Sequence, residues 1–148
     1  MDDTIIAAAQ HAFSSRLRGS SDVSDNTKNA QAIARTWRDT VHKLDPKRFQ
    51  FDVLVAAGMG QKIDIVDVEA GCAYTFKVSG KNAAGDFYKD IVKVIVWNEK
   101  KEKKLSRLVY ITEEEDGRRA LDAPVPLAYI AYLTARGLKV RVDYVRLN

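Results

Sequence analysis

Residues 62–78 read KIDIVDVEAGCAYTFKV, and this stretch decides the fold. β-Branched residues dominate residues 62–68, which is the composition of a strand, and Gly71 marks a tight turn. Residues 72–78 then return to a strand-like pattern. Immediately upstream, residues 49–55 alternate with the two-residue period of a strand. Three strands joined by tight turns predict an antiparallel meander.

Segments with the hydrophobic pattern of helices precede and follow this meander in the sequence. Upstream, apolar residues at helical spacing predict a helix over residues 4–18. A second helix is expected from a cap at Asp25 or Asn26 to Asp45, where the following proline ends it. The downstream elements are a well-buried helix over residues 86–100, a strand over 105–112, an acidic loop over 113–119, a helix over 127–135 and a strand over 138–147.

The order of these elements is α, α, β, β, β, α, β, α, β. A passage from strand to helix to strand across residues 72–112 predicts a parallel pair inside an otherwise antiparallel sheet, with helices on both faces. The chain has 148 residues, an ordinary size for one domain, and no internal repeat. We therefore expect a single α/β domain over residues 1–148, built on a mixed central sheet.

Composition and the N-terminal residues indicate the compartment. Apolar residues make up 46% of the chain and charged residues 30%, which is typical of a globular protein. No apolar run approaches the ~18 residues that span a bilayer. The start Met1-Asp2-Asp3 is acidic, whereas a signal peptide begins with positive charge. Cys72 is the single cysteine, which excludes an internal disulfide. We expect a soluble cytoplasmic protein with no membrane contact.

Charge is distributed unevenly along the chain. The net charge is +4, yet residues 51–100 carry six basic and seven acidic side chains. A slightly acidic centre in a basic protein is compatible with a carboxylate-bearing metal site flanked by phosphate-binding surfaces. The basic balance by itself favours a nucleic-acid partner only mildly.

One carboxylate and one lysine on neighbouring predicted strands form the most informative pair. Residues two apart on a strand point to the same face, so Thr75 and Lys77 project together, and the turn through Gly71 brings Asp64 near them. Metal-dependent phosphodiester cleavage uses this combination. The carboxylate holds Mg²⁺ through hard oxygen ligands, and the lysine orients or deprotonates the attacking water.

This arrangement resembles the PD-(D/E)XK nuclease superfamily, which includes many restriction endonucleases. Asp64 is followed after eleven residues by Thr75-Phe76-Lys77, on adjacent strands that precede a helix and a further strand. The family core has the order αβββαβ, and residues 27–112 reproduce that order, which leaves an extra C-terminal helix and strand. Residues 74–82, with residues 87–90 and Lys93, also resemble the third strand and following helix of bacterial members.

The resemblance implies a Mg²⁺- or Mn²⁺-dependent site, with Asp64 as the metal ligand and Lys77 as the motif lysine. Thr75 stands where the family has Glu or Asp, and a neutral hydroxyl is a weak Mg²⁺ ligand. Three interpretations follow. The acid has moved to a neighbouring element, the scaffold is catalytically inactive, or the strand register differs and another carboxylate fills the site. The candidate replacement acids are Asp90 and Asp86 on the next helix, followed by Asp67 and Glu69.

Two functions from different classes are compatible with these residues. The first is a metal-dependent DNA endonuclease, acting as a homodimer like many nucleases of this fold, in which Lys81, Lys89 and Lys93 contact phosphates. The second is a non-catalytic module on the same scaffold that binds nucleic acid or a protein partner. A small-molecule enzyme is less well supported, because Gly58-Met59-Gly60 is followed by a strand and no nucleotide cofactor is expected. Each charged residue also has a purely structural interpretation, Asp64 as a partner of a nearby lysine and the helix lysines as an exposed face.

Overall fold

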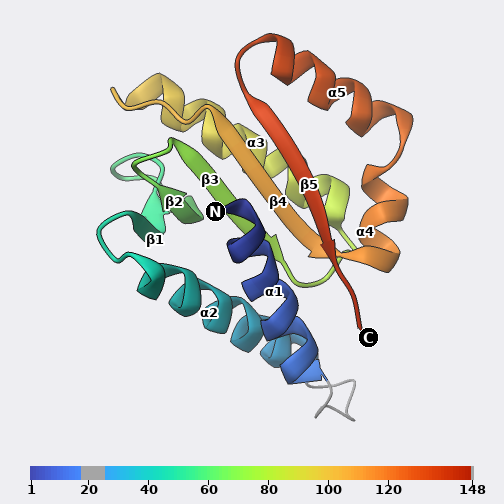
Figure 1. The fold of residues 1–148 in the computed structure, drawn as a ribbon. Coiled ribbons are helices and arrows are strands. Elements are labelled where there is room, and N and C mark those ends of the chain that lie inside the picture. The colour runs from blue at the N-terminus through green and yellow to red at the C-terminus, as the bar shows by residue number, and fades with distance from the viewer. Residues whose placement is uncertain (18–25, 148) are drawn as a thin grey trace.

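The computed structural model describes residues 1–17 and 26–147, and its centre is a five-stranded sheet with helices on both faces (Figure 1). The end of the first helix at residue 18 and the cap expected at Asp25 lie outside the described residues. The helices are α1 (Asp2–Leu17), α2 (Asn26–Leu44), α3 (Ala83–Lys100), α4 (Glu114–Leu121) and α5 (Pro124–Ala135). The strands are β1 (Phe49–Leu54), β2 (Lys62–Asp67), β3 (Cys72–Lys77), β4 (Arg107–Glu113) and β5 (Lys139–Val145).

The sheet has the strand order β1-β2-β3-β4-β5, so every strand neighbours the next one along the chain. β1, β2 and β3 form the antiparallel meander that the sequence predicts, and β3 pairs with β4 in parallel. The expectation of an otherwise antiparallel sheet is wrong, because β4 and β5 are also parallel. α4 and α5 form a second crossover between them, and a helical crossover returns the chain in its original direction.

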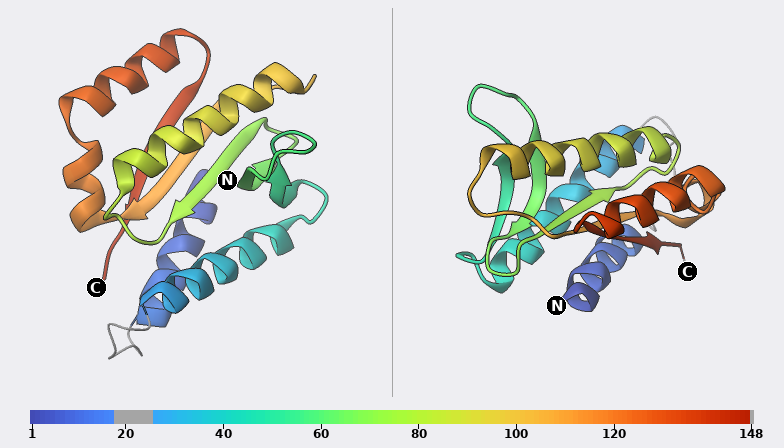
Figure 2. Two further views of the ribbon diagram at one scale, coloured as in Figure 1. Left: turned by 180° about the vertical axis from the view of Figure 1, so that it is seen from behind. Right: turned by 90° about the horizontal axis from the view of Figure 1, so that it is seen from above.

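Two layers of helices cover the sheet (Figure 2). α1 and α2 pack on one face, where Trp37 and Phe49 join Tyr74 and Phe76 of β3 in an apolar cluster. The other face carries α3, α4 and α5, and Phe87 is part of the apolar cluster there. β3 is buried on both sides because its side chains alternate between these two clusters. We call the two sets of helices the α1–α2 layer and the α3 layer.

The segment interpreted as an acidic loop over residues 113–119 is wrong in the structure, where helix α4 occupies most of it. The Glu113 side chain caps this helix by accepting hydrogen bonds from the backbone N–H groups of Glu115 and Asp116. Gly117 and Leu121 are buried on its inner side. Among the described residues, no helix combines the length and the apolarity needed to cross a bilayer.

Candidate active site

The residues singled out by sequence meet where β2 and β3 lie beneath α3. The β2–β3 ladder ends with Ile65 opposite Tyr74, so Asp64 lies just past the last pair, close to Thr75. Strand alternation puts Thr75 and Lys77 on the face that α3 covers, and Asp64 lies close to them, since the charges of Lys77 and Asp90 both act on its carboxylate. The Asp64 carboxylate accepts a hydrogen bond of 3.1 Å from the backbone N–H of Phe76, which ties this carboxylate to β3.

Asp90 on α3 is the point at which these side chains converge. Its side chain is 2% exposed, and its Oδ2 lies 3.9 Å from the Nζ of Lys77. Lys93, one helical turn further on, places its Nζ 3.1 Å from the Oδ1 of Asp90. The Asp90 carboxylate is therefore buried between two ammonium groups, one from the strand and one from its own helix.

The pKa of Asp64 is raised above its ordinary value of 3.8, chiefly because burial disfavours the charged carboxylate. The ammonium of Lys77 and the N–H of Phe76 oppose this rise, whereas the negative charge of Asp90 adds to it. The two carboxylates are therefore within electrostatic reach of each other. Tyr110 of β4 senses the same charges, since burial and then Asp90, Asp86 and Asp64 raise the pKa of its hydroxyl.

Several buried oxygens on this face have no hydrogen-bond partner among the described residues. They include the Oδ2 of Asp90 and the hydroxyl oxygens of Thr75 and Thr112. Thr112 lies on β4 directly opposite Lys77 in the parallel register, next to the candidate site. A buried polar atom without a partner costs free energy, and it marks a place where a ligand oxygen or a cation can bind.

Whether a divalent cation fits the candidate site depends on the ligand atoms that its residues offer. Asp64 and Asp90 supply two hard carboxylates and Thr75 a neutral hydroxyl, which suit Mg²⁺ or Mn²⁺ rather than a softer metal. The described part of the chain contains no group of three or more His, Cys, Asp or Glu side chains that could hold a metal. These residues therefore fit an ion that takes its remaining ligands from water and a substrate phosphate, as Mg²⁺ usually does, and not a closed protein cage.

The structure places the four candidates for the acid missing at Thr75 in different surroundings. Asp90 contacts Lys77, and Asp86 lies on the same helix, near enough to affect Tyr110. Asp67 sits three residues after Asp64 and so faces the α1–α2 layer, where it binds Arg48. Glu69 is exposed in the following turn. Asp90 is thus the acid that the fold brings to Asp64 and Lys77.

The three lysines expected to contact phosphates have different surroundings. Lys93 is 14% exposed and belongs to the site through its ion pair with Asp90. Lys89 is exposed on α3. Lys81 is exposed in the loop before α3 and lines a separate cavity of about 310 Å³ that includes Ser79 and Glu113. Phosphate contacts by these three side chains stay predictions.

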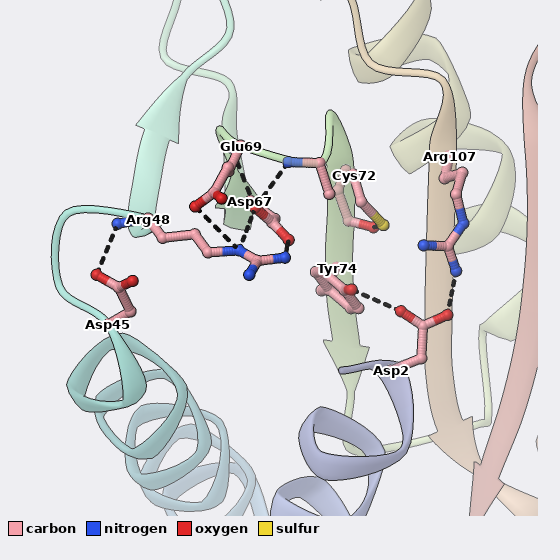
Figure 3. Close-up of polar contacts among 10 residues, drawn as sticks. Asp2, Asp45, Arg48, Asp67, Glu69, Cys72, Tyr74 and Arg107 are labelled. Atoms are coloured by element: carbon pink, nitrogen blue, oxygen red, sulfur yellow. Dashed lines mark hydrogen bonds and ion pairs between the residues drawn. The ribbon is translucent and has the colours of Figure 1, made fainter.

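A second polar cluster lies on the opposite face of the sheet (Figure 3), and sequence reasoning did not single it out as a site. Arg48 binds Asp67 in a bidentate manner, with Nε to Oδ1 and Nη2 to Oδ2 both at 2.9 Å. Asp2 at the start of α1 accepts a hydrogen bond of 2.6 Å from the Tyr74 hydroxyl and pairs with Arg107. A cavity of about 320 Å³ lies among these residues. Arginines already bind both aspartates, so the cluster fastens α1 to β3 and β4 and joins the start of β1 to the end of β2.

Comparison of the chain with family models, with curated proteins and with solved structures gives no significant match. The molecule is an α/β protein with a five-stranded mixed sheet and helices on both faces. Its distinguishing feature is the group of charges that Asp64, Lys77, Asp90 and Lys93 form between the sheet and α3.

Proposed function

We propose that this chain is a metal-dependent DNA endonuclease of the PD-(D/E)XK type, in which Asp90 replaces the acid missing at Thr75. The contact between Lys77 and Asp90 carries the proposal, because it joins the motif lysine to a helix carboxylate beside Asp64. The order and directions of the strands support a restriction endonuclease-like core. An antiparallel meander, then α3, then a strand parallel to β3, is the αβββαβ arrangement that the resemblance implies.

The chain's own residues have distinct roles in this proposal. Asp64 and Asp90 offer carboxylate oxygens to the cation, and the N–H of Phe76 holds the Asp64 carboxylate in place. Lys77 presents its ammonium beside these carboxylates, where it can donate a hydrogen bond to a phosphate oxygen or to the attacking water. Lys93 balances the charge of Asp90. A bound divalent ion supplies Lewis-acid polarisation of the phosphate and lowers the pKa of a coordinated water.

The experiment measures Mn²⁺ binding by isothermal titration calorimetry and cleavage of plasmid DNA in Mg²⁺ or Mn²⁺. Asp64→Asn and Asp90→Asn keep the size of each side chain and remove its charge. We expect both variants to lose metal binding and cleavage, while Glu102→Gln at an exposed acid leaves both unchanged. Equal cleavage by the wild type and Asp64→Asn contradicts the proposal.

The charge balance of the site favours a second function, a non-catalytic module that binds nucleic acid or a protein partner. Lys77 and Lys93 both pair with Asp90, and the charge of Lys77 also acts on Asp64, so the two carboxylates face two ammonium groups without a cation. This alternative predicts no Mn²⁺ binding and no cleavage. In its nucleic-acid form it predicts DNA binding that weakens steeply with salt, because phosphate contacts release counterions. A binding constant that stays flat between low and moderate salt argues against that form.

A further inference from the structure

Helix α5 is apolar around its whole circumference but is only partly covered. Its sequence, PVPLAYIAYLTA, contains no charged residue, and a helix of this kind is normally buried on all sides. In this structure only Pro126 and Leu133 are buried, whereas Val125 is 71% exposed and Tyr132 is 51% exposed. The outer side of α5 is therefore an apolar surface that the described residues leave open to solvent.

α3 extends this surface on one side. Figure 2 shows α3 and α5 on the same face of the sheet, and a cavity of about 750 Å³ between them is lined by Ile95, Tyr132 and Leu138. Tyr129 joins the two helices, because its ring contacts that of Tyr88 on α3 with centroids 5.7 Å apart. Val92 is exposed one turn before Ile95. The α3–α5 face is defined by Val92, Ile95, Val125, Tyr129 and Tyr132.

The charges next to α5 make this face complementary to itself. Asp122 is exposed just before α5 begins, and Arg136 is exposed at its C-terminal end, where its guanidinium lies over the Tyr132 ring. Two copies of α5 that pack antiparallel across a two-fold axis bring Asp122 of each copy toward Arg136 of the other. A two-fold contact repeats every pair, so both ends of the helix gain an opposite charge.

The exposed area reaches the lower limit of a specific interface. The exposed parts of the residues on the α3–α5 face amount to on the order of 500 Å² per copy, so a two-fold contact that covers the face completely buries about 1,000 Å², the lower limit for a specific interface. We propose that the α3–α5 face binds a second copy of this chain. Ile95 and Tyr88 lie on the α5 side of α3, whereas Lys93 faces Asp90 on the other side. The proposed contact therefore lies beside the buried Asp90 and not over it, and the proposal does not require nuclease activity.

The test measures the mass of the full chain by sedimentation velocity over a series of protein concentrations. We expect a dimer, and we expect Val125→Glu to raise its dissociation constant at least about tenfold, because a charge then enters an apolar contact. Leu54→Glu is the control, since Leu54 is 44% exposed on β1, at the opposite edge of the sheet, and it should leave the dimer intact. Circular dichroism confirms that each variant is folded.

A charge exchange tests the orientation of the two copies. Asp122→Arg and Arg136→Asp should each weaken the dimer, and the double variant should restore it, because the exchanged charges again face each other across the axis. A wild-type chain that stays monomeric at every concentration overturns the proposal. A dimer that Val125→Glu leaves unchanged overturns it as well.

Discussion

Asp64 and Asp67 lie three residues apart on β2, face opposite layers of helices, and have pKa values shifted in opposite directions. Burial raises the pKa of Asp64 more than Lys77 and the N–H of Phe76 lower it. Burial also acts to raise the pKa of Asp67, but the hydrogen bond from Arg48 and the N–H of Ala70 hold it below the ordinary value of 3.8. One carboxylate is thus destabilised by folding and the other is stabilised.

Replacing Asp64 by Asn should stabilise the protein at neutral pH. A carboxyl whose pKa is raised on folding ionises more readily in the unfolded chain, so its charge opposes folding above pH 3.8 and does so fully above the folded pKa. Asp64→Asn removes that charge, and its amide oxygen can still accept the N–H of Phe76. We expect a gain in the free energy of unfolding at pH 7, measured by urea denaturation, which disappears as the pH falls below 3.8.

Replacing Asp67 by Asn should have the opposite effect. A carboxyl with a lowered pKa contributes stability above pH 3.8, and that stability is lost as the pH falls through the folded value. The variant breaks the bidentate pair with Arg48 at a fully buried carboxylate, so we expect a loss of about 2–3 kcal/mol at pH 7. The difference in the free energy of unfolding between the variant and the wild type should become smaller as the pH falls below 3.8. Equal pH profiles for the two variants would contradict the assigned directions.

Part of the candidate site follows from sequence because its residues are close along the chain. The tight turn through Gly71 brings Asp64 to Thr75 and Lys77, and the sequence placed the first candidates for a replacement acid on the next helix, ahead of Asp67 and Glu69. Sequence alone could not choose between Asp86 and Asp90, which lie about one turn apart on α3. Tyr110 and Thr112 could not be found at all, because their position depends on the parallel register between β3 and β4.

In helix α4, packing against the sheet outweighs the helix propensity of an individual residue. In an exposed helix, replacing glycine by alanine stabilises by up to about 1 kcal/mol. At Gly117 an added Cβ would lie 2.5 Å from the Cγ2 of Thr112 on β4, so α4 would have to move away from the sheet. We therefore expect Gly117→Ala to destabilise the protein by about 1–3 kcal/mol in urea denaturation.

Gly85 in α3 provides the matched control. The three atoms nearest to an added Cβ there all belong to the Asn82 side chain, the closest at 3.2 Å, and that exposed side chain can move because it makes no capping hydrogen bond. Gly85→Ala should therefore be neutral or stabilising. Destabilisation of similar size in both variants would mean that the contact with Thr112 does not decide the effect.

The helices and strands with a strong hydrophobic periodicity were predictable from sequence. The elements whose structure depends on tertiary contacts were not. The meander and the long helices carry patterns that depend only on neighbours in sequence. α4 is short, rich in charge and interrupted by Gly117, so its pattern indicates a loop until β4 covers its inner side. The direction of β5 was predictable, because the helix expected over 127–135 already stands between two strands, and a helical crossover connects parallel strands.

At the scale of the whole molecule, β3 couples the two layers of helices. Tyr74 and Phe76 pack against the α1–α2 layer, and Ala73 packs against the α3 layer. Neither layer can leave the sheet without exposing one side of this strand. The protein should therefore unfold in a single cooperative transition, as small domains usually do.

The two tryptophans allow this expectation to be measured for each layer separately. Trp37 is buried in the α1–α2 layer and Trp97 in the α3 layer. Trp97→Phe leaves Trp37 as the only tryptophan, and Trp37→Phe leaves Trp97. Within each variant, the urea midpoint from fluorescence should equal that from far-UV circular dichroism. If the Trp37 signal changes at lower urea than the dichroism of the same variant, the α1–α2 layer unfolds before the sheet and β3 does not couple the two layers.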